Sequence, residues 1–194
     1  AEDRPKDIKF LIDVMERFHR GADSRFMGRI DLENIGVTGH SFGGYTAVAA
    51  ADLDPRVKAI APMAAVGRNR ERFDVPVLAI VATEDDTIKE EGNARIRAFY
   101  EASKGPRFLV EFKNAGHYSF TDMPQYDPAF GDGVGTGVRI TNGEQLTYLD
   151  IPTAYRLTNG YTTAFFGRFL KQQTDYLGYL TQNHLPEEVV LKHD

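Results

Sequence analysis

The chain has 194 residues, of which 42% are hydrophobic and 26% are charged, a globular composition with enough length for one domain, over residues 1–194, with a sizeable core. The net charge of −5 comes from acids and bases that are mixed along the chain, so no nucleic-acid partner is expected. The absence of cysteine excludes disulfides and thiolate catalysis, and no apolar run approaches the ~20 residues that would span a bilayer.

The N-terminal part of the chain predicts a helix, a strand and a second helix. Apolar residues between Pro5 and Arg20 recur at helical spacing, which indicates an amphipathic helix. Ile35–Thr38 is typical of a short buried strand and leads directly into the glycine-rich segment Gly39–Gly44. Small residues over Tyr45–Ala51 then predict a helix that can approach a sheet closely.

The middle of the chain continues the alternation. The compact apolar runs Val57–Ala61 and Val75–Val81 predict strands of a parallel sheet that is covered on both faces. A helix over Lys89–Ser103 and a strand over Arg107–Phe112 follow. This order is that of an α/β fold with a mostly parallel sheet flanked by helices.

The C-terminal part is expected to hold one long connection and one helix. Between Asp122 and Pro152 the sequence is rich in Gly, Asp, Pro and Tyr and has no clear period, which indicates a surface connection that borders the active site. Apolar residues over Thr153–Thr181 predict a closing helix that packs back onto the sheet.

Ser41 is the candidate nucleophile. The segment Gly39-His40-Ser41-Phe42-Gly43 fits the pattern of a nucleophile elbow, in which a strand turns sharply into a helix and exposes a serine hydroxyl. Three fixed positions match by chance in about one chain of this length in twenty, but the strand before the motif and the small residues after it are the context that the mechanism requires. The alternative is that Ser41 only caps the following helix.

A serine nucleophile needs a base and an acid that orients the base, in the chain order serine, acid, histidine. His117 is the candidate base because it follows a predicted strand in a glycine-containing loop. Asp85 is the candidate acid, with Asp86 as the alternative, since both follow the strand Val75–Val81. Whichever aspartate is not catalytic is expected to cap the helix near Lys89, and Glu84 is expected to be structural.

Further residues are candidates for supporting roles. The N–H of Phe42 is expected to donate to the oxyanion of the tetrahedral intermediate, whereas the other donor normally comes from a loop much earlier in the chain. His19, His184, His193 and His40 are expected to be surface or packing residues. The candidates for an aromatic substrate rim are His40, Tyr118, Phe120, Tyr126 and Phe130. Asp127 and Asp132 fit no calcium-binding spacing, so no metal site is expected.

These motifs together resemble the α/β-hydrolase superfamily, and within it the dienelactone-hydrolase-like esterases related to platelet-activating-factor acetylhydrolases and bacterial polyester-degrading cutinases. The resemblance covers most of residues 3–180 and rests on Arg4–Ile8, Gly36–Gly44, Ala82–Ile88, Gly116–Phe120 and the closing helix. It implies ester hydrolysis in two steps, with Ser41 acylated, His117 moving protons and Asp85 holding His117. It implies no metal or organic cofactor, and it favours a secreted or periplasmic location.

The chain departs from this pattern at its beginning. Such enzymes usually have several strands before the nucleophile, whereas one helix and one strand precede Ser41 here. The expectation is therefore a C-terminal portion of a longer chain, or a protein in which a second polypeptide or a second copy supplies the missing strands.

Several functions remain compatible with these residues. A carboxylesterase is favoured, and a polyester or lipid-acetyl hydrolase would use the same triad. A thioesterase or a dipeptidyl-type peptidase would also use it, because the pocket and not the triad selects the leaving group. A non-catalytic α/β-hydrolase module for binding or assembly is the alternative from a different class.

Overall fold

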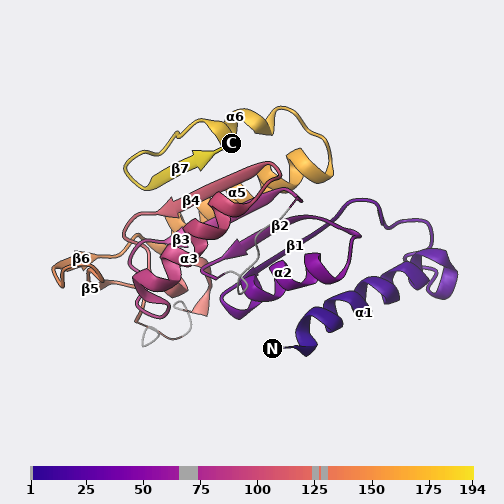
Figure 1. The fold of residues 1–194 in the computed structure, drawn as a ribbon, viewed down its shortest axis with the longest axis horizontal. Helices are drawn as coiled ribbons and strands as arrows, with labels where there is room; N and C mark the ends of the chain where they lie inside the picture. The colour runs from indigo at the N-terminus through magenta and orange to yellow at the C-terminus, as the bar shows by residue number, and fades with distance from the viewer. Residues whose placement is uncertain (1, 66–73, 124–126, 128–130) are drawn as a thin grey trace.

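A five-stranded sheet forms the centre of the protein (Figure 1). A computed structural model describes residues 2–65, 74–123, 127 and 131–194. The strands, in their order across the sheet, are β1 (Ile35–His40), β2 (Val57–Met63), β3 (Val77–Ala82), β4 (Arg107–Phe112) and β7 (Val189–His193). The first four strands are parallel and β7 is antiparallel to β4. The structure therefore has the mostly parallel α/β sheet that the sequence predicts.

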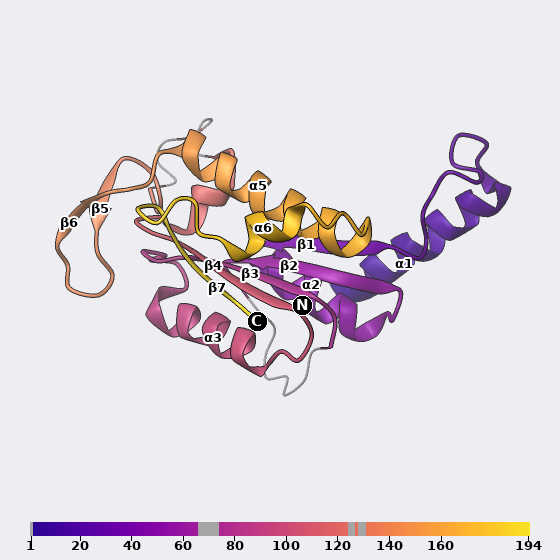
Figure 2. The ribbon, with the colours of Figure 1, turned by 90° about the horizontal axis from the view of Figure 1, so that it is seen from above.

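Helices cover both faces of the sheet (Figure 2). One face carries α1 (Asp3–Arg17), α2 (Phe42–Leu53) and α3 (Lys89–Ala102), and the other carries α5 (Ile151–Leu170) and α6 (Tyr176–Thr181). Successive residues of β3 alternate between the two cores, and every residue of β3 is buried. This double coverage explains why the strand is apolar throughout. No helix within the described ranges is long and apolar enough to cross a membrane.

The region after β4 differs from the prediction in three ways. The closing helix is two helices, because Gln172 adopts a left-handed backbone with φ of 55°, a conformation that ends an α-helix. The expected long connection contains a hairpin of β5 (Thr136–Val138) and β6 (Gln145–Thr147). The tail forms the edge strand β7, which the sequence pattern does not predict.

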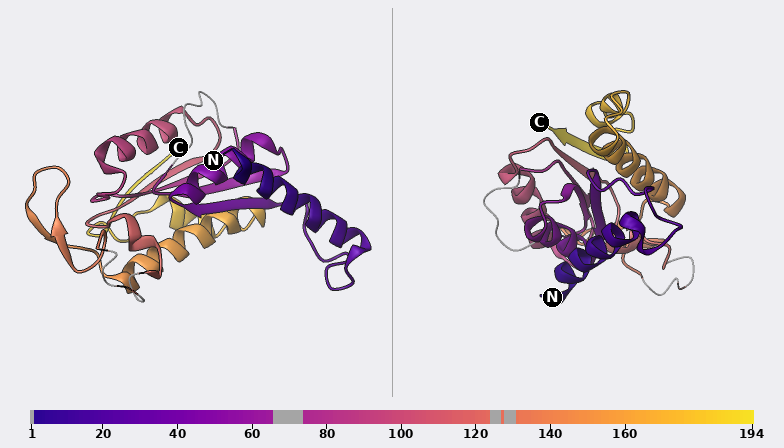
Figure 3. Two further views of the ribbon diagram at one scale, coloured as in Figure 1. Left: turned by 90° about the horizontal axis from the view of Figure 1, so that it is seen from below. Right: turned by 90° about the vertical axis from the view of Figure 1, so that its right-hand side faces the viewer.

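The ends of the molecule have different roles. The segment of α1 and the π-helical turn Phe18–Ala22 projects at one end, and the β5–β6 hairpin lies at the other (Figures 2 and 3). The parallel strands point towards the end with the hairpin (Figure 1). The loops that follow β1, β3 and β4 therefore meet at one edge of the sheet, which is where ligands bind in open α/β folds.

Candidate active site

Ser41 occupies the sharp turn between β1 and α2. Its backbone has φ of 54° and ψ of −121°, a conformation that is strained for a residue with a side chain. The Ser41 N–H donates to the carbonyl oxygen of Met63 on β2 at 2.9 Å. The Ser41 side chain makes no capping hydrogen bond to α2, so the alternative that it only caps the helix is not supported.

The glycines of the elbow have different packing environments. A Cβ atom on Gly39 would lie 2.4 Å from the carbonyl carbon of Gly43, and one on Gly44 would lie 3.0 Å from the carbonyl oxygen of Met63. A Cβ atom on Gly43 would meet no described atom within 4 Å. Packing therefore requires glycine at Gly39 and favours it at Gly44, although the motif pattern names Gly39 and Gly43.

His117 lies between Ser41 and Asp85. Its Nε2 is 2.9 Å from the Ser41 Oγ, and its Nδ1 is 2.8 Å from the Asp85 Oδ2. A carboxylate can only accept, so Nδ1 carries the proton and Nε2 is free to accept from the serine hydroxyl. His117 is 2% exposed and Asp85 is fully buried, so water competes little for these hydrogen bonds.

Asp85, and not Asp86, is the aspartate in contact with His117. The other oxygen of the Asp85 carboxylate, Oδ1, accepts from the N–H groups of Thr87 at 3.1 Å and Ile88 at 2.9 Å. Asp86 is exposed. The expected capping of the turn before α3 by the second aspartate is wrong, because Asp85 itself accepts these N–H groups while it holds His117.

His40 packs directly against His117. The two ring centroids are 4.6 Å apart, and the His40 Nε2–H donates to the main-chain carbonyl oxygen of His117 at 2.8 Å. Burial, and then the neighbouring His117, lower the pKa of His40 to about 4. His40 is therefore neutral at pH 7 and adds no positive charge beside the candidate base.

The aromatic rim is only partly as expected. Tyr118 is half-buried and its ring meets the ring of His117 edge-on at 5.2 Å between centroids. Phe120 is 9% exposed and belongs to the core, where its ring packs against Phe112 and lies 5.9 Å from His40. Phe120 is therefore a core residue that supports His40 and not a rim residue. Tyr126 and Phe130 lie outside the described residues.

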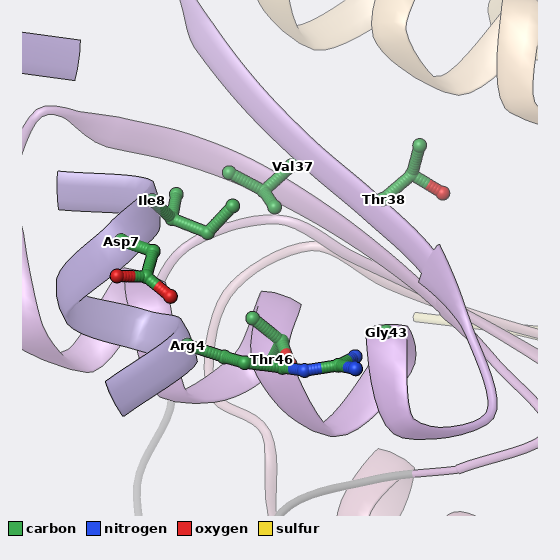
Figure 4. Close-up of a pocket in the computed structure, with 7 residues that line it drawn as sticks. All are labelled: Arg4, Asp7, Ile8, Val37, Thr38, Gly43 and Thr46. Atoms are coloured by element: carbon green, nitrogen blue, oxygen red, sulfur yellow. The ribbon is translucent and has the colours of Figure 1, made fainter. Parts of the chain in front are cut away.

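Phe42 begins α2 directly after the nucleophile. Its N–H is one of the first groups of the helix, which have no acceptor within the helix. Its side chain is 41% exposed, and the Arg4 guanidinium lies 4.3 Å from the ring centroid. Figure 4 shows Arg4 reaching from α1 towards the start of α2, where it lines a pocket of about 240 Å³. None of Ser41, Asp85 and His117 lines this pocket, so it is separate from the candidate active site.

The remaining expected residues have structural partners. Glu84 is buried and accepts from Arg139 Nη1 at 2.8 Å and from the Ile140 N–H at 3.1 Å. His19 accepts a hydrogen bond from the Ile30 N–H, and His193 lies on β7. Among the residues that the structure describes, no group of three or more His, Asp or Glu side chains is placed to hold a metal ion.

Asp132 lies at the site although the sequence draws attention to it only as an acidic residue whose spacing fits no calcium motif. Asp132 contacts both the loop of Asp85 and the loop of His117. Its only signal in the sequence is its position between two glycines, in a stretch that has no periodic pattern.

Known proteins resemble this chain in sequence and in structure. The model of the PETase family, described as PET hydrolase-like, matches residues 2–127. Lipase 1 of Moraxella sp. (strain TA144) is 34% identical over 98 residues, which are 50% of this chain and 30% of the lipase. A solved structure of ferulic acid esterase from Streptomyces cinnamoneus is 25% identical with a TM-score of 0.72, over 98% of this chain and 54% of the esterase.

The matches agree with the architecture. The structural match covers nearly all of this chain with a TM-score that indicates a shared fold. This chain spans about half of that esterase, and the matched segment spans less than a third of the lipase. The family match covers the elbow, the Asp85 loop and the His117 loop. The chain has the α/β-hydrolase fold and belongs to the PET hydrolase-like family.

Proposed function

We propose that this protein is a serine carboxylesterase that hydrolyses carboxylic esters through an acyl-enzyme on Ser41. The observation that carries the proposal is the continuous series of hydrogen bonds from the Ser41 Oγ through His117 to the buried Asp85. Family membership and the similarity to an esterase and a lipase support ester hydrolysis as the reaction class.

The first half of the reaction acylates the serine. Ser41 Oγ attacks the ester carbonyl carbon while His117 Nε2 takes the hydroxyl proton, and Asp85 stabilises the imidazolium that forms. The negative oxygen of the tetrahedral intermediate accepts from the Phe42 N–H at the positive end of α2. The C–O bond to the alcohol then breaks, and His117 gives its proton to the departing alcohol.

The second half removes the acyl group. His117 takes a proton from a water molecule, whose oxygen attacks the acyl carbon. Collapse of the second tetrahedral intermediate breaks the bond to Ser41 Oγ, which regains its proton from His117. The products are one carboxylic acid and one alcohol, and no external oxidant, reductant or metal is needed to balance the steps.

A polyester with aromatic acyl groups is the second candidate substrate. The partly exposed rings of Phe42 and Tyr118 flank Ser41 and His117 in the sequence, and aromatic rings favour stacking against aromatic acyl groups. The PET hydrolase-like family and the ferulic acid esterase likeness point to the same substrate class. Comparing release of terephthalate from a polyester film with hydrolysis of soluble acetate and butyrate esters separates the two candidates.

The test is covalent labelling with a fluorophosphonate, which reacts with activated serine nucleophiles. We expect one adduct on Ser41 in the full-length protein, mapped by mass spectrometry, and none in Ser41→Ala. His117→Ala is expected to lower the labelling rate by at least ~10³-fold, because the hydroxyl loses its base. A folded wild-type protein that shows no adduct would instead support a non-catalytic module.

The two aspartates provide a matched comparison for the acid. Asp85→Asn is expected to lower kcat for a soluble ester by about 10³- to 10⁴-fold, because an amide in place of the carboxylate favours the wrong His117 tautomer. Asp86→Asn is expected to change kcat less than about 2-fold, since Asp86 is exposed. Equal losses in both variants would overturn the assignment of the acid.

A further inference from the structure

Asp132 connects the two loops that hold the candidate acid and the candidate base. Its Oδ2 accepts from the Thr87 N–H at 2.9 Å and from the Thr87 Oγ1–H at 2.8 Å. Its Oδ1 accepts from the His117 N–H at 3.0 Å, and its main-chain oxygen accepts from the Tyr118 N–H at 2.9 Å. One residue thus makes two hydrogen bonds to each loop.

The chain around Asp132 is pressed closely against the His117 loop. A Cβ atom on Gly116 would lie 2.4 Å from the Asp132 Oδ1 and 2.3 Å from the Gly133 nitrogen. Gly133 has φ of +107°, and Ser119 Oγ accepts from the Gly116 N–H at 3.0 Å and donates to the Gly133 carbonyl oxygen at 3.2 Å. This packing leaves little freedom for the carboxylate to take another position.

The bonds of Asp132 reach the triad through its nearest neighbours. Thr87 also donates its N–H to the Asp85 Oδ1, so one backbone group lies between the two carboxylates. On the other loop, the N–H that Asp132 accepts belongs to His117 itself. A shift of Asp132 would therefore move the Thr87 N–H that donates to the acid, as well as the backbone N–H of the base itself.

We propose that Asp132 is a positioning residue that fixes the distance between the Asp85 loop and the His117 loop. The inference rests on the proposed function, because it concerns how Ser41, His117 and Asp85 are aligned for catalysis. Asp132 lies beyond residues 2–127, which the family model matches, so family membership does not assign it this role. Its carboxylate already accepts three hydrogen bonds, which explains its place in the site without a calcium ion.

Loss of the carboxylate is expected to affect turnover more than binding. Without it, the buried His117 N–H loses its acceptor and the loop relaxes, and a displacement of about 1 Å can lower a rate by ~10²-fold. We therefore expect Asp132→Ala to lower kcat for a soluble ester by about 10- to 100-fold, with KM within about 3-fold of wild type. Asp132→Asn is expected to rescue little, since an amide cannot accept from both loops at once.

The experiment compares the full-length wild type with Asp132→Ala, Asp132→Asn and a control, Asp122→Ala, which removes an exposed aspartate shortly after the 3₁₀ turn His117–Phe120. For each protein, kcat, KM, the rate of fluorophosphonate labelling and the thermal midpoint are measured, with the concentration of active protein set by the extent of labelling. The proton between His117 Nδ1 and Asp85 is followed by its downfield resonance in the proton NMR spectrum. In Asp132→Ala we expect this resonance to broaden, whereas a merely structural role would leave it unchanged.

Substitutions at Thr87 test the same proposal if Asp132→Ala does not fold. Thr87→Val removes the hydroxyl that donates to Asp132 but keeps the backbone bond, and Thr87→Ser restores a hydroxyl. We expect Thr87→Val to lower kcat by about 3- to 10-fold and Thr87→Ser to retain most of it. Thr87 is exposed, so either change leaves core packing intact.

The outcomes distinguish this inference from the proposed function. A wild type without an adduct on Ser41 would overturn both. A wild type that is labelled at Ser41, together with Asp132 and Thr87→Val variants that keep wild-type kcat and labelling rates, would overturn the positioning role alone. A loss of kcat in these variants with normal folding, an unchanged KM and an unaffected Asp122→Ala would support it.

Discussion

Single residues of the elbow and its neighbours combine strain with tight hydrogen bonding. The left-handed backbone of Ser41 costs on the order of 1–3 kcal/mol. The Ser41 N–H bonds to Met63, and the Ser41 carbonyl accepts from the N–H groups of Gly44 and Tyr45, so both polar backbone groups of the strained residue are satisfied. The strain is thus held by the sheet and the helix while the side chain stays free to meet His117.

His40 makes stability depend on acid pH. Its pKa is about 4 in the folded protein, below the usual value of 6.5, chiefly because of burial. Between these values the unfolded chain takes up a proton that the folded protein does not, so the free energy of unfolding falls as pH drops from 6.5 to 4. Above 6.5 this contribution is fully present, and with allowance for partial exposure it amounts to about 1–3 kcal/mol.

The measurement is urea unfolding of the wild type and of His40→Asn across this pH range. The amide of asparagine does not titrate, so the stability of the variant should decline less steeply towards low pH, and groups distant from His40 contribute equally to both curves. Parallel curves would mean that His40 titrates alike in the folded and unfolded states.

At the scale of elements, the junction of β1 and α2 depends on a backbone-to-backbone contact. Gly39 at the end of the strand faces the Gly43 backbone in the first turn of the helix, and a methyl group has no room between them. Other loops at this edge are held by side chains instead. Glu84, which follows β3, accepts hydrogen bonds from Arg139 and Ile140 in the segment between β5 and β6. Close glycine packing and buried charge thus hold different parts of the same sheet edge.

Alanine at the two glycines of the motif is expected to have opposite effects on stability. Gly39→Ala forces β1 and α2 apart and should lower the free energy of unfolding by about 3 kcal/mol. Gly43→Ala meets no described atom within 4 Å and adds a better helix former, so it should raise stability by about 0.5–1 kcal/mol. Chemical denaturation of both variants tests this, and similar losses would show that the steric difference is not decisive.

At the scale of the whole molecule, two apolar cores on opposite faces of the sheet hold the layers together. One core joins the sheet to α5 and α6, and the other joins it to α1, α2 and α3. Phe165 of α5 is fully buried, and its ring contacts Phe108 on β4 as well as Phe166 and Phe169. The first core therefore depends on aromatic side chains far apart in the sequence.

Truncation of this aromatic centre is expected to destabilise the fold. Phe165→Ala leaves a cavity between α5 and the sheet and should lower the free energy of unfolding by about 3–5 kcal/mol. Phe10→Ala on α1 removes a side chain that is 59% exposed and should change it by less than about 1 kcal/mol. If urea unfolding showed the same loss of free energy of unfolding in both variants, the central place of Phe165 in the core would be contradicted.

Much of the architecture is predictable because its signals are local. The strand Arg107–Phe112 has the predicted bounds, and the apolar run before Thr83 forms a strand buried on both faces. The break after α5 and the edge strand β7 were not predicted, because Gln172 carries no clear turn signal and a short strand is stabilised by its partner β4.

Periodicity and spacing along the chain are sufficient to predict the α/β class, the serine at the strand-to-helix turn and the histidine in a loop after a later strand. Three features are visible only in the folded protein: Asp85 and not Asp86 contacts His117, Phe120 lies in the core, and Asp132 joins the two loops. Each of these depends on contacts between segments far apart in the sequence, whose relative orientation is fixed by the packing of the whole sheet and its helices and leaves no pattern in neighbouring residues.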